Sequence, residues 1–439
     1  LGHCTISTNV AGAAGNGLGG GIFLQGIADA EVSSCRFFNN YASGGSAAEP
    51  PAPATSGLGG GLFVEESFGI IVDGNKFDFN VAQTATPQFN RAGSGGGMFV
   101  ANSSMATIGN NLFDRNTAGF SGTGFGGGAA VIKGDGYVGA ITGTIVYSNT
   151  FTQNWATVIN FIGAAGGGLY AYGIDDSQVT GNTFTANAAN TMGEGGMQMT
   201  PIPYGGGLGL RHIYHAQVAN NRFEGNVATV GGGGVGGGLG MRSDKDIPTV
   251  GINVVDNLFI RNLGDSAMRG DAAGGAISVS QGKSITVAHN MLIENSGTLT
   301  TEAVPEKASS AIMLSGLNDT MAVPNYVGLW DVVVDSNQIL DSGQGLSATV
   351  GLPNNFAVSV QAVDRFTITN NLITGSTLGG IVAVYEAYTD GDGDPLDTHG
   401  VIANNTLYGN GTYGMWLLNR WRPDILKITN NIVTNNKYG

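Results

Sequence analysis

The sequence predicts an all-β fold, a right-handed parallel β-helix of about 13 coils that extends as a single domain over residues 1–439. Three observations support this prediction. A nine-residue motif recurs thirteen times, a run of glycines recurs before alternating apolar residues, and the repeat period is mostly 31 to 40 residues. Repeats of this length with short strands and no 3.6-residue period are typical of a β-solenoid, because each unit buries its apolar face only by stacking on its neighbours.

The nine-residue motif has four constant columns. Its first position is Leu, Val or Ile, its fourth is Asn in eleven copies and Cys in two, and its ninth is Asn in eleven copies and Ser in two. Its sixth position is Phe in seven consecutive copies, from Phe37 to Phe259, and aliphatic elsewhere. The copies occupy residues 1–9, 32–40, 72–80, 108–116, 146–154, 179–187, 218–226, 254–262, 287–295, 334–342, 368–376, 402–410 and 428–436.

Stacking the coils turns each column into a ladder. Equivalent residues on neighbouring strands lie roughly 4.8 Å apart. A buried Asn at a turn must satisfy its side-chain amide, and an identical Asn one rung away offers both a donor and an acceptor. We therefore expect two internal Asn ladders with an apolar column between them.

The glycine marker precedes a strand in many of the coils. It reads GLGGGLFVEES at residues 57–67, and near-copies occur in other coils. The residue types alternate after it, which predicts that Leu62 and Val64 point inward and Phe63 points outward. A phosphate-binding loop is excluded because it requires a following helix. The glycines instead fit a tight corner where stacked backbones crowd one another.

The composition restricts the possible partners. Only 11% of the residues are charged and the net charge is −14, which argues against nucleic acid and anionic membranes as partners. The apolar runs are too short for a transmembrane helix. Motif copies begin at Leu1 and end shortly before Gly439. This predicts a rod that is uncapped at both ends, either a fragment of a longer chain or a filament subunit.

The two cysteines, Cys4 and Cys35, occupy the first ladder column one coil apart. The spacing between rungs falls within the Cα range of a disulfide. A pair of buried thiols in place of Asn is the alternative.

The most polar stretch of the outward face lies on three consecutive central coils. Polysaccharide lyases need a base and a cation or Arg that neutralises a carboxylate, and glycosidases need two carboxylates. Both kinds of side chain occur here, and Gly209 and Gly240 would leave a shallow trough beside Tyr170. Salt pairs between rungs on a solvated face are the alternative. The candidate catalytic residues are Asp175, Asp176, Arg211, His215, Arg242, Asp244 and Lys245.

Aromatic residues at outward positions are candidate ligand-binding groups. Exposed aromatic ladders bind sugar rings or a partner surface. The alternative is that a long loop, such as the Pro-rich turn at residues 43–57, folds over them. The candidates are Phe23, Phe63, Phe99, Tyr170 and Tyr172.

An acidic loop, TDGDGDPLDTHG at residues 389–400, is the candidate metal site. Four carboxylates, from Asp390, Asp392, Asp394 and Asp397, fall within eight residues. Alternating Asp and Gly allows their oxygens to converge on Ca²⁺, the only cofactor that we expect. The loop does not match the EF-hand pattern, and a solvated acidic turn is the alternative.

The combined motifs resemble two known groups. The coil plan and the Asn columns are similar to those of the right-handed parallel β-helix superfamily that includes pectate lyases and polygalacturonases. The pairing of GGA(I/L/V) with FxxN resembles the repeats of chlamydial polymorphic outer-membrane proteins. Here FxxN occurs at residues 77–80, 113–116 and 184–187, and GGAI occurs at residues 274–277. The second resemblance implies a surface adhesin.

Two functions follow as hypotheses. The first is a secreted or cell-surface structural or adhesive protein without enzymatic activity, which binds polysaccharide or other surface proteins or assembles head to tail. Low charge, regular rungs and adhesin-like repeats favour it. The alternative is a polysaccharide lyase or glycoside hydrolase that acts on an extracellular polysaccharide, which the polar central coils favour.

Overall fold

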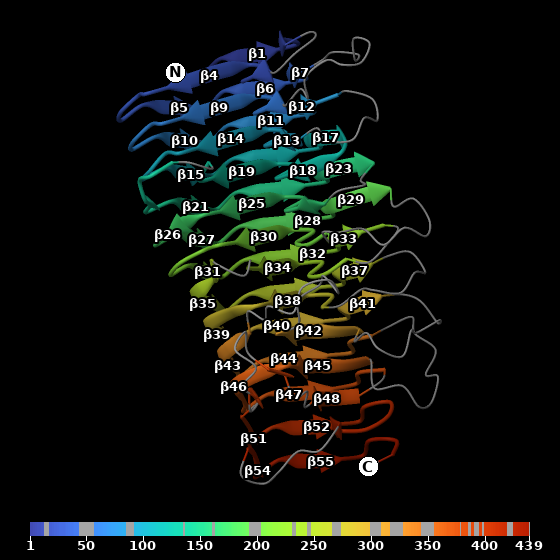
Figure 1. Cartoon of the computed structure of the whole chain (residues 1–439). Coiled ribbons are helices and arrows are strands. Elements are labelled where there is room, and N and C mark those ends of the chain that lie inside the picture. The colour runs from blue at the N-terminus through green and yellow to red at the C-terminus, as the bar shows by residue number, and fades with distance from the viewer. Residues whose placement is uncertain are drawn as a thin grey trace.

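The computed structural model is a long rod of stacked coils. Figure 1 shows the strands of successive coils side by side along the rod, with the two termini at opposite ends. Strands of successive coils pair in parallel, so the predicted all-β parallel β-helix is confirmed. None of the described residues forms a helix long and apolar enough to cross a bilayer. The structure describes residues 1–12, 17–43, 57–84, 92–134, 137–159, 163–192, 203–230, 234–243, 247–265, 274–298, 309–316, 328–343, 355–377, 379–384, 388–389, 395–396, 399–418 and 425–438.

Sheet 1 contains the strands that follow the glycine markers and continues through the strands at the same register in the later coils. Its alternation is as predicted at Leu62 and Val64, which belong to the central hydrophobic core. Its twelve strands are β4 Ile22–Gln25, β9 Leu62–Glu65, β14 Met98–Ala101, β19 Ala129–Ile132, β25 Leu169–Tyr172, β30 Leu208–Arg211, β34 Leu239–Arg242, β38 Ile277–Ser280, β42 Ser309–Ser315, β45 Asn355–Gln361, β48 Gly379–Val384 and β53 Met415–Leu418.

Sheet 2 consists of the strands that precede the first ladder position. The apolar first residue of the motif, such as Val72, is buried in the core from this sheet. Its twelve strands are β5 Glu31–Ser33, β10 Ile71–Asp73, β15 Thr107–Gly109, β21 Ile145–Tyr147, β27 Gln178–Thr180, β31 Gln217–Ala219, β35 Val250–Val255, β39 Gly282–Ala288, β43 Leu329–Asp335, β46 Val363–Thr369, β51 Gly400–Ala403 and β54 Leu426–Thr429.

Sheet 3 lies between the two ladders and has thirteen strands, one for each copy of the motif. The middle residue of each three-residue strand is the Phe or aliphatic residue of the sixth column. The strands are β1 Thr5–Ser7, β6 Arg36–Phe38, β11 Lys76–Asp78, β16 Leu112–Asp114, β22 Thr150–Thr152, β28 Thr183–Thr185, β32 Arg222–Glu224, β36 Leu258–Ile260, β40 Met291–Ile293, β44 Gln338–Leu340, β47 Leu372–Thr374, β52 Thr406–Tyr408 and β55 Ile432–Thr434.

Sheet 4 follows the second ladder position. It consists of β2 Val10–Gly12, β7 Tyr41–Ser43, β12 Val81–Gln83, β17 Thr117–Ser121, β23 Trp155–Ile159, β29 Ala188–Met192, β33 Val227–Thr229, β37 Leu263–Asp265 and β41 Ser296–Thr298.

Sheet 5 precedes the glycine markers and packs closely on sheet 4. A Cβ placed on Gly57 of sheet 5 would lie 1.8 Å from the carbonyl oxygen of Ala82, so glycine is required for this contact. Its strands are β3 Gly17–Leu18, β8 Gly57–Leu58, β13 Ala92–Ser94, β18 Thr123–Phe125 and β24 Ala164–Ala165. Two small strand pairs complete the described elements, namely β20 Ile141–Thr142 with β26 Ile174–Asp175 and β49 Tyr388–Thr389 with β50 Pro395–Leu396.

Both predicted Asn ladders are present. The side-chain Nδ2 of Asn75 donates to Asn111 Oδ1 on the next coil at 3.0 Å, and the backbone N–H of Asn75 donates to the same oxygen at 2.8 Å. The same Nδ2 donates to the carbonyl oxygen of Val32 on the preceding coil at 2.8 Å. The pattern repeats along both ladders, so these buried amides are satisfied between coils. The residue before each ladder position has positive φ, which turns the chain at both corners.

The sixth column forms a continuous stack of phenylalanine rings through seven coils. Neighbouring ring centroids are 4.6 to 4.8 Å apart and nearly parallel. The strand spacing therefore sets the ring spacing, and the rings pack at the usual contact distance of stacked aromatic pairs. The stack consists of Phe37, Phe77, Phe113, Phe151, Phe184, Phe223 and Phe259, all fully buried.

The first glycine of each triplet makes an additional corner. Gly59 has a φ of +64°, and a Cβ on it would lie 2.4 Å from the carbonyl oxygen of Leu62. Only glycine fits a backbone that is both left-handed and this close to a neighbouring carbonyl group. Where sheet 5 is present, the triplet thus folds the chain from sheet 5 into sheet 1.

Cys4 and Cys35 form a disulfide that joins the first two coils, with Cα atoms 4.6 Å apart. The structure therefore selects the disulfide from the two alternatives. The backbone N–H of Cys35 donates to Asn75 Oδ1 at 2.9 Å, so the bridge continues directly into the first Asn ladder.

Candidate functional site

The corner between sheets 1 and 2 brings polar side chains of successive coils together. In ten coils this connection has a residue with positive φ at the same register position, and we name this column the left-handed corner. A left-handed backbone costs a residue with a Cβ roughly 1 kcal/mol, so the surrounding ladder must impose it. The column consists of Asp29, Gly69, Met105, Gly143, Asp176, His215, Gly251, Ser284, Asp331 and Arg365.

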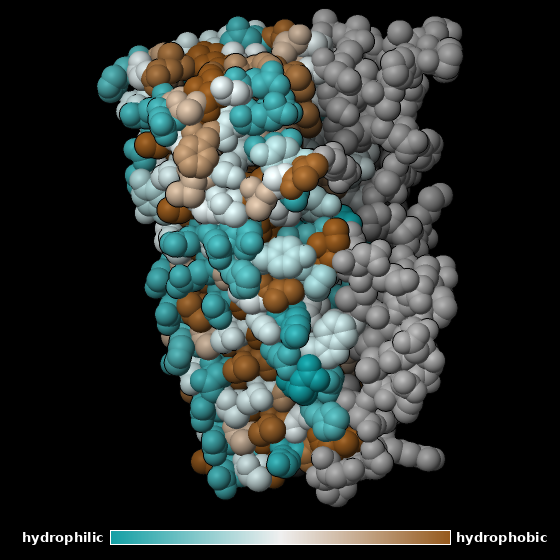
Figure 2. Space-filling view, turned by 60° about the vertical axis from the view of Figure 1, so that its left-hand side comes forward, coloured by the Kyte–Doolittle hydropathy of each residue, from teal (hydrophilic) through white to brown (hydrophobic). Residues whose placement is uncertain are grey.

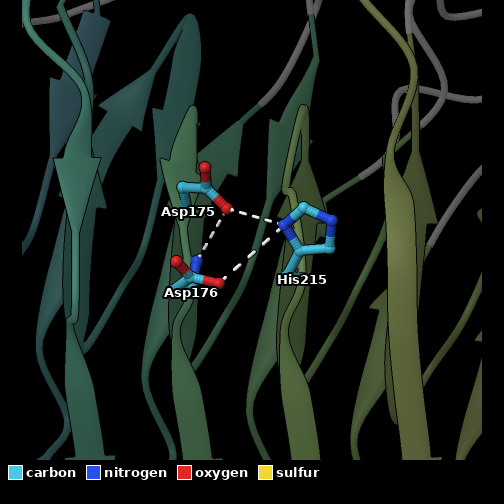
Figure 3. Close-up of side chains that lie close together, drawn as sticks. All are labelled: Asp175, Asp176 and His215. Atoms are coloured by element: carbon cyan, nitrogen blue, oxygen red, sulfur yellow. Dashed lines mark hydrogen bonds and ion pairs between the residues drawn. The ribbon is translucent and has the colours of Figure 1, made fainter.

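Three of the sequence-predicted catalytic residues converge at this corner. His215 Nδ1 lies 3.1 Å from Asp175 Oδ1 and 3.8 Å from Asp176 Oδ1 (Figure 3). The backbone N–H of Asp176 donates to Asp175 Oδ1 at 2.9 Å, which orients that carboxylate. One donor atom from each of the three side chains lies within 4.8 Å of the others. We call Asp175, Asp176 and His215 the first corner cluster.

The imidazole of His215 is held between two coils. Its Nδ1 faces the two carboxylates of the preceding coil, and its other nitrogen lies on the side away from them (Figure 3). On the following coil, a Cβ on Gly251 would lie 2.9 Å from His215 Cδ2. Glycine at position 251 therefore leaves room for the ring. The imidazole remains 63% exposed at its side chain, so the cluster is open to solutes.

The two candidate arginines lie beside the first corner cluster in sequence but do not join it. Arg211 and Arg242 are register partners at the ends of β30 and β34. Among the described residues, the side-chain hydrogen bonds and ion pairs of the cluster join only its own three residues. Arg211 instead lies over the ring of Tyr172, with its Cζ 5.7 Å from the ring centroid. The remaining candidates, Asp244 and Lys245, lie outside the described residues.

Most of the predicted aromatic ladder is not exposed, and this expectation is wrong for three of its members. Phe63, Phe99 and Tyr170 are 1%, 5% and 2% exposed, although they point away from the central core. Leu58 and Phe125 of sheet 5 pack against them, and Phe125 stacks on Tyr170 with ring centroids 4.9 Å apart. The strands of sheet 5 thus cover this face. This agrees with the alternative that another part of the chain folds over these aromatic residues, although the covering segment is a strand and not the Pro-rich turn.

Burial also changes the chemistry of Tyr170. Desolvation raises the pKa of its hydroxyl well above the usual value, and the nearby Tyr204 adds to this. The hydroxyl is therefore neutral and lies 3.4 Å from the hydroxyl of Tyr204. Of the five aromatic candidates, Phe23 and Tyr172 keep exposed area, and Phe23 is 40% exposed at the N-terminal end of the stack.

The predicted trough beside Tyr170 is filled. A Cβ on Gly209 would lie 2.8 Å from the backbone nitrogen of Gly166, and one on Gly240 would lie 2.6 Å from that of Gly205. These glycines allow neighbouring backbone to pack on sheet 1, and they leave no open groove at that place.

A second cluster on the same corner was missed from the sequence. Arg365 donates from Nε to Asp331 Oδ1 at 2.6 Å and from Nη1 to Asp364 Oδ2 at 2.5 Å. His399 Nδ1 lies 3.1 Å from Asp364 Oδ1. The hydrogen bond from Arg365 holds the pKa of Asp331 below its usual value. We call Asp331, Asp364, Arg365 and His399 the second corner cluster. The similarity between the second and the first corner cluster can be recognised only when the strand register between coils is known.

The four aspartates of the acidic loop, Asp390, Asp392, Asp394 and Asp397, lie outside the described residues. Calcium binding by this loop stays a prediction.

The lateral surface beside sheet 2 mixes polar and apolar side chains. Figure 2 shows hydrophilic and hydrophobic residues interspersed along the described part of this side of the rod. Together, the fold and the corner clusters define a β-solenoid that carries its convergent polar groups on an exposed edge.

Comparison with known proteins gives matches only among solved structures. No family model matches the chain, and no curated protein matches it. A periplasmic alginate epimerase is 12% identical, with 91% of this chain and 76% of that chain covered and a TM-score of 0.47.

Two further structures are similar at the same level. A tailspike protein mutant of an E. coli bacteriophage, in complex with a pentasaccharide, is 12% identical over 98% of this chain and 71% of that chain, with a TM-score of 0.40. The catalytic domain of an α-1,3-glucanase in complex with tetrasaccharides is 13% identical over 99% of this chain and 65% of that chain, with a TM-score of 0.37. Similarities this low assign no activity to this chain.

Proposed function

We propose that this protein is an extracellular β-helix that binds polysaccharide along its lateral surface and acts as a structural or adhesive element. The observation that carries the proposal is a strip of aromatic and hydrogen-bonding side chains at the corner of sheets 1 and 2. We call it the Tyr172 strip, and it consists of Tyr172, Asp175, Arg211, Tyr214 and His215.

The Tyr172 strip has the composition of a sugar-binding surface. The ring of Tyr172 keeps exposed area and is flanked by Arg211 and by His212, whose ring centroid is 5.0 Å away. An aromatic ring of fixed orientation offers an apolar face to a sugar ring at low cost in side-chain entropy. Asp175 and His215 lie on the same corner, where carboxylate and imidazole groups accept and donate hydrogen bonds to hydroxyl groups.

The disulfide supports an extracellular or periplasmic location. Disulfides persist in oxidising compartments and are rare in the reducing cytosol. The bridge between Cys4 and Cys35 is therefore consistent with a secreted protein.

Binding is tested by affinity electrophoresis against a panel of neutral and acidic polysaccharides. We expect retardation by at least one polysaccharide, and we expect Tyr172→Ala to weaken this binding roughly tenfold, or about 1.4 kcal/mol. Tyr408→Ala is the matched control, because Tyr408 is 48% exposed on sheet 3, away from the strip. Equal loss in both variants, or no retardation by any polysaccharide, would refute the proposal.

Polysaccharide hydrolysis is the second candidate function. The close approach of Asp175 and Asp176 favours it, because glycosidases act with paired carboxylates. Against it, the two carboxylates are 37% and 71% exposed, and a general acid usually depends on burial to stay protonated at neutral pH. Release of reducing ends that is lost in Asp176→Asn would establish hydrolysis, and binding without release would support the structural proposal.

A further inference from the structure

The geometry points to a binding site for a divalent transition-metal ion, such as Zn²⁺, at the first corner cluster. The proposed ligands are Asp175 Oδ1, Asp176 Oδ1 and His215 Nδ1. This site is distinct from the acidic loop, and it does not depend on polysaccharide binding.

The positions of the three donor atoms fit such an ion. Ligand atoms held about 2.1 Å from a tetrahedral ion lie about 3.4 Å from one another. The observed separations of His215 Nδ1 from the two carboxylate oxygens, 3.1 and 3.8 Å, bracket this value. The third separation is within 4.8 Å, so a small rotation of Asp176, which is exposed, completes the arrangement. When Nδ1 binds the ion, the ring proton resides on Nε2.

An independent observation comes from the second corner cluster, five coils further along the same corner. Asp364 and His399 have the register relation of Asp175 and His215, since each His follows its Asp by one coil and one residue. The position of Asp176 is taken there by Arg365. The Arg365 guanidinium lies between the carboxylates of Asp331 and Asp364. The protein thus supplies its own cation at this second position.

The first corner cluster keeps the Asp–His pair, but Asp176 stands in place of the cation Arg365 and Gly143 in place of Asp331. The ion pairs of Asp175 and Asp176 are made with the imidazole of His215, and neither carboxylate pairs with a Lys or Arg among the residues that the structure describes. Two carboxylates 4.8 Å or less apart repel each other, and an external cation would relieve this repulsion.

The donor set selects the class of ion. Two carboxylate oxygens and one imidazole nitrogen suit Zn²⁺ and similar transition metals, whereas Ca²⁺ and Mg²⁺ prefer oxygen ligands alone. The three protein ligands leave a position open to water or to a solute oxygen, as in zinc sites that are not purely structural.

The test is calorimetric titration of the tag-free full chain with Zn²⁺, in the presence of millimolar Ca²⁺ to saturate sites made of oxygen ligands alone. We expect one zinc ion per chain and at least about tenfold weaker binding in Asp176→Asn and His215→Gln, since even outer-shell changes cost this much. His399→Gln is the matched control and should bind as the wild type does. All four proteins are melted with and without Zn²⁺, and only the wild type and the control should gain a higher Tm.

Three outcomes would overturn the inference. The first is the absence of a zinc-dependent heat or Tm shift in a folded wild-type chain. The second is binding that persists in His215→Gln, which would place the ion elsewhere. Loss of zinc binding in His399→Gln alone would move the site to the second corner cluster and would equally contradict the proposal.

Discussion

The N-terminal and C-terminal halves of the rod build the same coil from different residues. Through residue 298, each coil is marked by glycine, and its first marker glycine has positive φ, as at Gly59 and Gly274. Beyond residue 309, Ser310 and Phe356 occupy the register position of Gly275, and no described residue near them has positive φ. There β42 and β45 run straight for seven residues, where the N-terminal strands of sheet 1 have four.

This difference shows which sheets form without the glycine triplet and which structural feature the triplet adds. The parallel sheets 1, 2 and 3 continue through both halves, so they do not depend on the triplet. Within the described ranges, in contrast, all strands of sheets 4 and 5 come from the N-terminal half. The triplet therefore provides the additional corner that folds sheet 5 over sheet 1 and buries Phe63 and Phe99.

The ladders differ between the halves as well. The second ladder is Asn from Asn9 to Asn295, and Ser342 and Ser376 interrupt it before Asn410. The first ladder is continuous from Asn75 to Asn431. The fold is thus maintained where only the first Asn ladder is continuous. We infer that the second Asn ladder adds stability to the coils in which it is complete.

The largest expected effect is that of breaking a complete rung. Asn154→Ala removes the acceptor of the N–H and Nδ2 groups of Asn116 and the donor to the carbonyl oxygen of Phe113. Three buried polar groups would lose partners, so we expect a loss of roughly 3–6 kcal/mol in the free energy of unfolding. Urea denaturation measures this loss.

The matched variant in the other half is Ser342→Ala. Ser342 occupies the same column, and its buried hydroxyl has no hydrogen-bond partner in the part of the chain that the structure describes. We expect a change of about 1 kcal/mol or less. Equal effects of the two substitutions would show that the ladder does not stabilise the N-terminal half in this way.

An intermediate effect is expected at the triplet corner. Gly59→Ala adds a Cβ 2.4 Å from the carbonyl oxygen of Leu62 at a φ of +64°, so we expect a loss of roughly 2–4 kcal/mol. Gly225→Ala is the control, because Gly225 has a similar φ of +61° and nothing within 4 Å of the added carbon. Its cost should be only about 1 kcal/mol. Thermal melts of the two variants check the difference, and a larger loss in Gly225→Ala would contradict it.

The smallest effect is expected at the second corner cluster. Arg365→Gln removes the hydrogen bond that lowers the pKa of Asp331, so this pKa should rise toward its usual value of about 3.9, as NMR titration would show. A lowered folded-state pKa stabilises the protein above the unfolded-state pKa, and this contribution is lost as the pH falls through the folded-state pKa.

The wild type should therefore exceed Arg365→Gln in stability by less than about 1 kcal/mol at pH 7, because Asp331 and Arg365 are partly exposed. The difference should vanish in acid, below the folded-state pKa of Asp331. Urea denaturation at both ends of this pH range checks the sign. A difference that grows in acid would contradict the assignment.

The repeat columns were predictable from the sequence because they are periodic. The Asn ladders, the Phe stack and the alternation after the glycine marker depend on the spacing within one coil, which every copy repeats. The burial of Tyr170 was not predictable in this way, because it depends on Phe125 of the previous coil returning across the outer face.

The corner clusters were predictable from the sequence only in part. The sequence brought Asp175, Asp176 and His215 together on successive coils, and the structure shows that they meet. The sequence also placed Arg211 on the coil of His215 and Arg242 on the next coil. It did not reveal the left-handed turn that separates the two arginines from the cluster. Asp364 and His399 have the same relation as Asp175 and His215, and they were missed because coils of unequal length hide the register.

The ladder hydrogen bonds give the rod a direction. Within a ladder, each Asn–Asn hydrogen bond runs from Nδ2 of one coil to Oδ1 of the coil that follows, as Asn111 accepts from Asn75 and donates to Asn149. The same Nδ2 also donates to a backbone carbonyl oxygen of the coil that precedes. Each coil thus shows one kind of face to its predecessor and the other kind to its successor. Every coil therefore offers the same pair of faces to its neighbours. A whole coil is thus the unit by which such a chain can grow or shrink in evolution without leaving an unmatched rung.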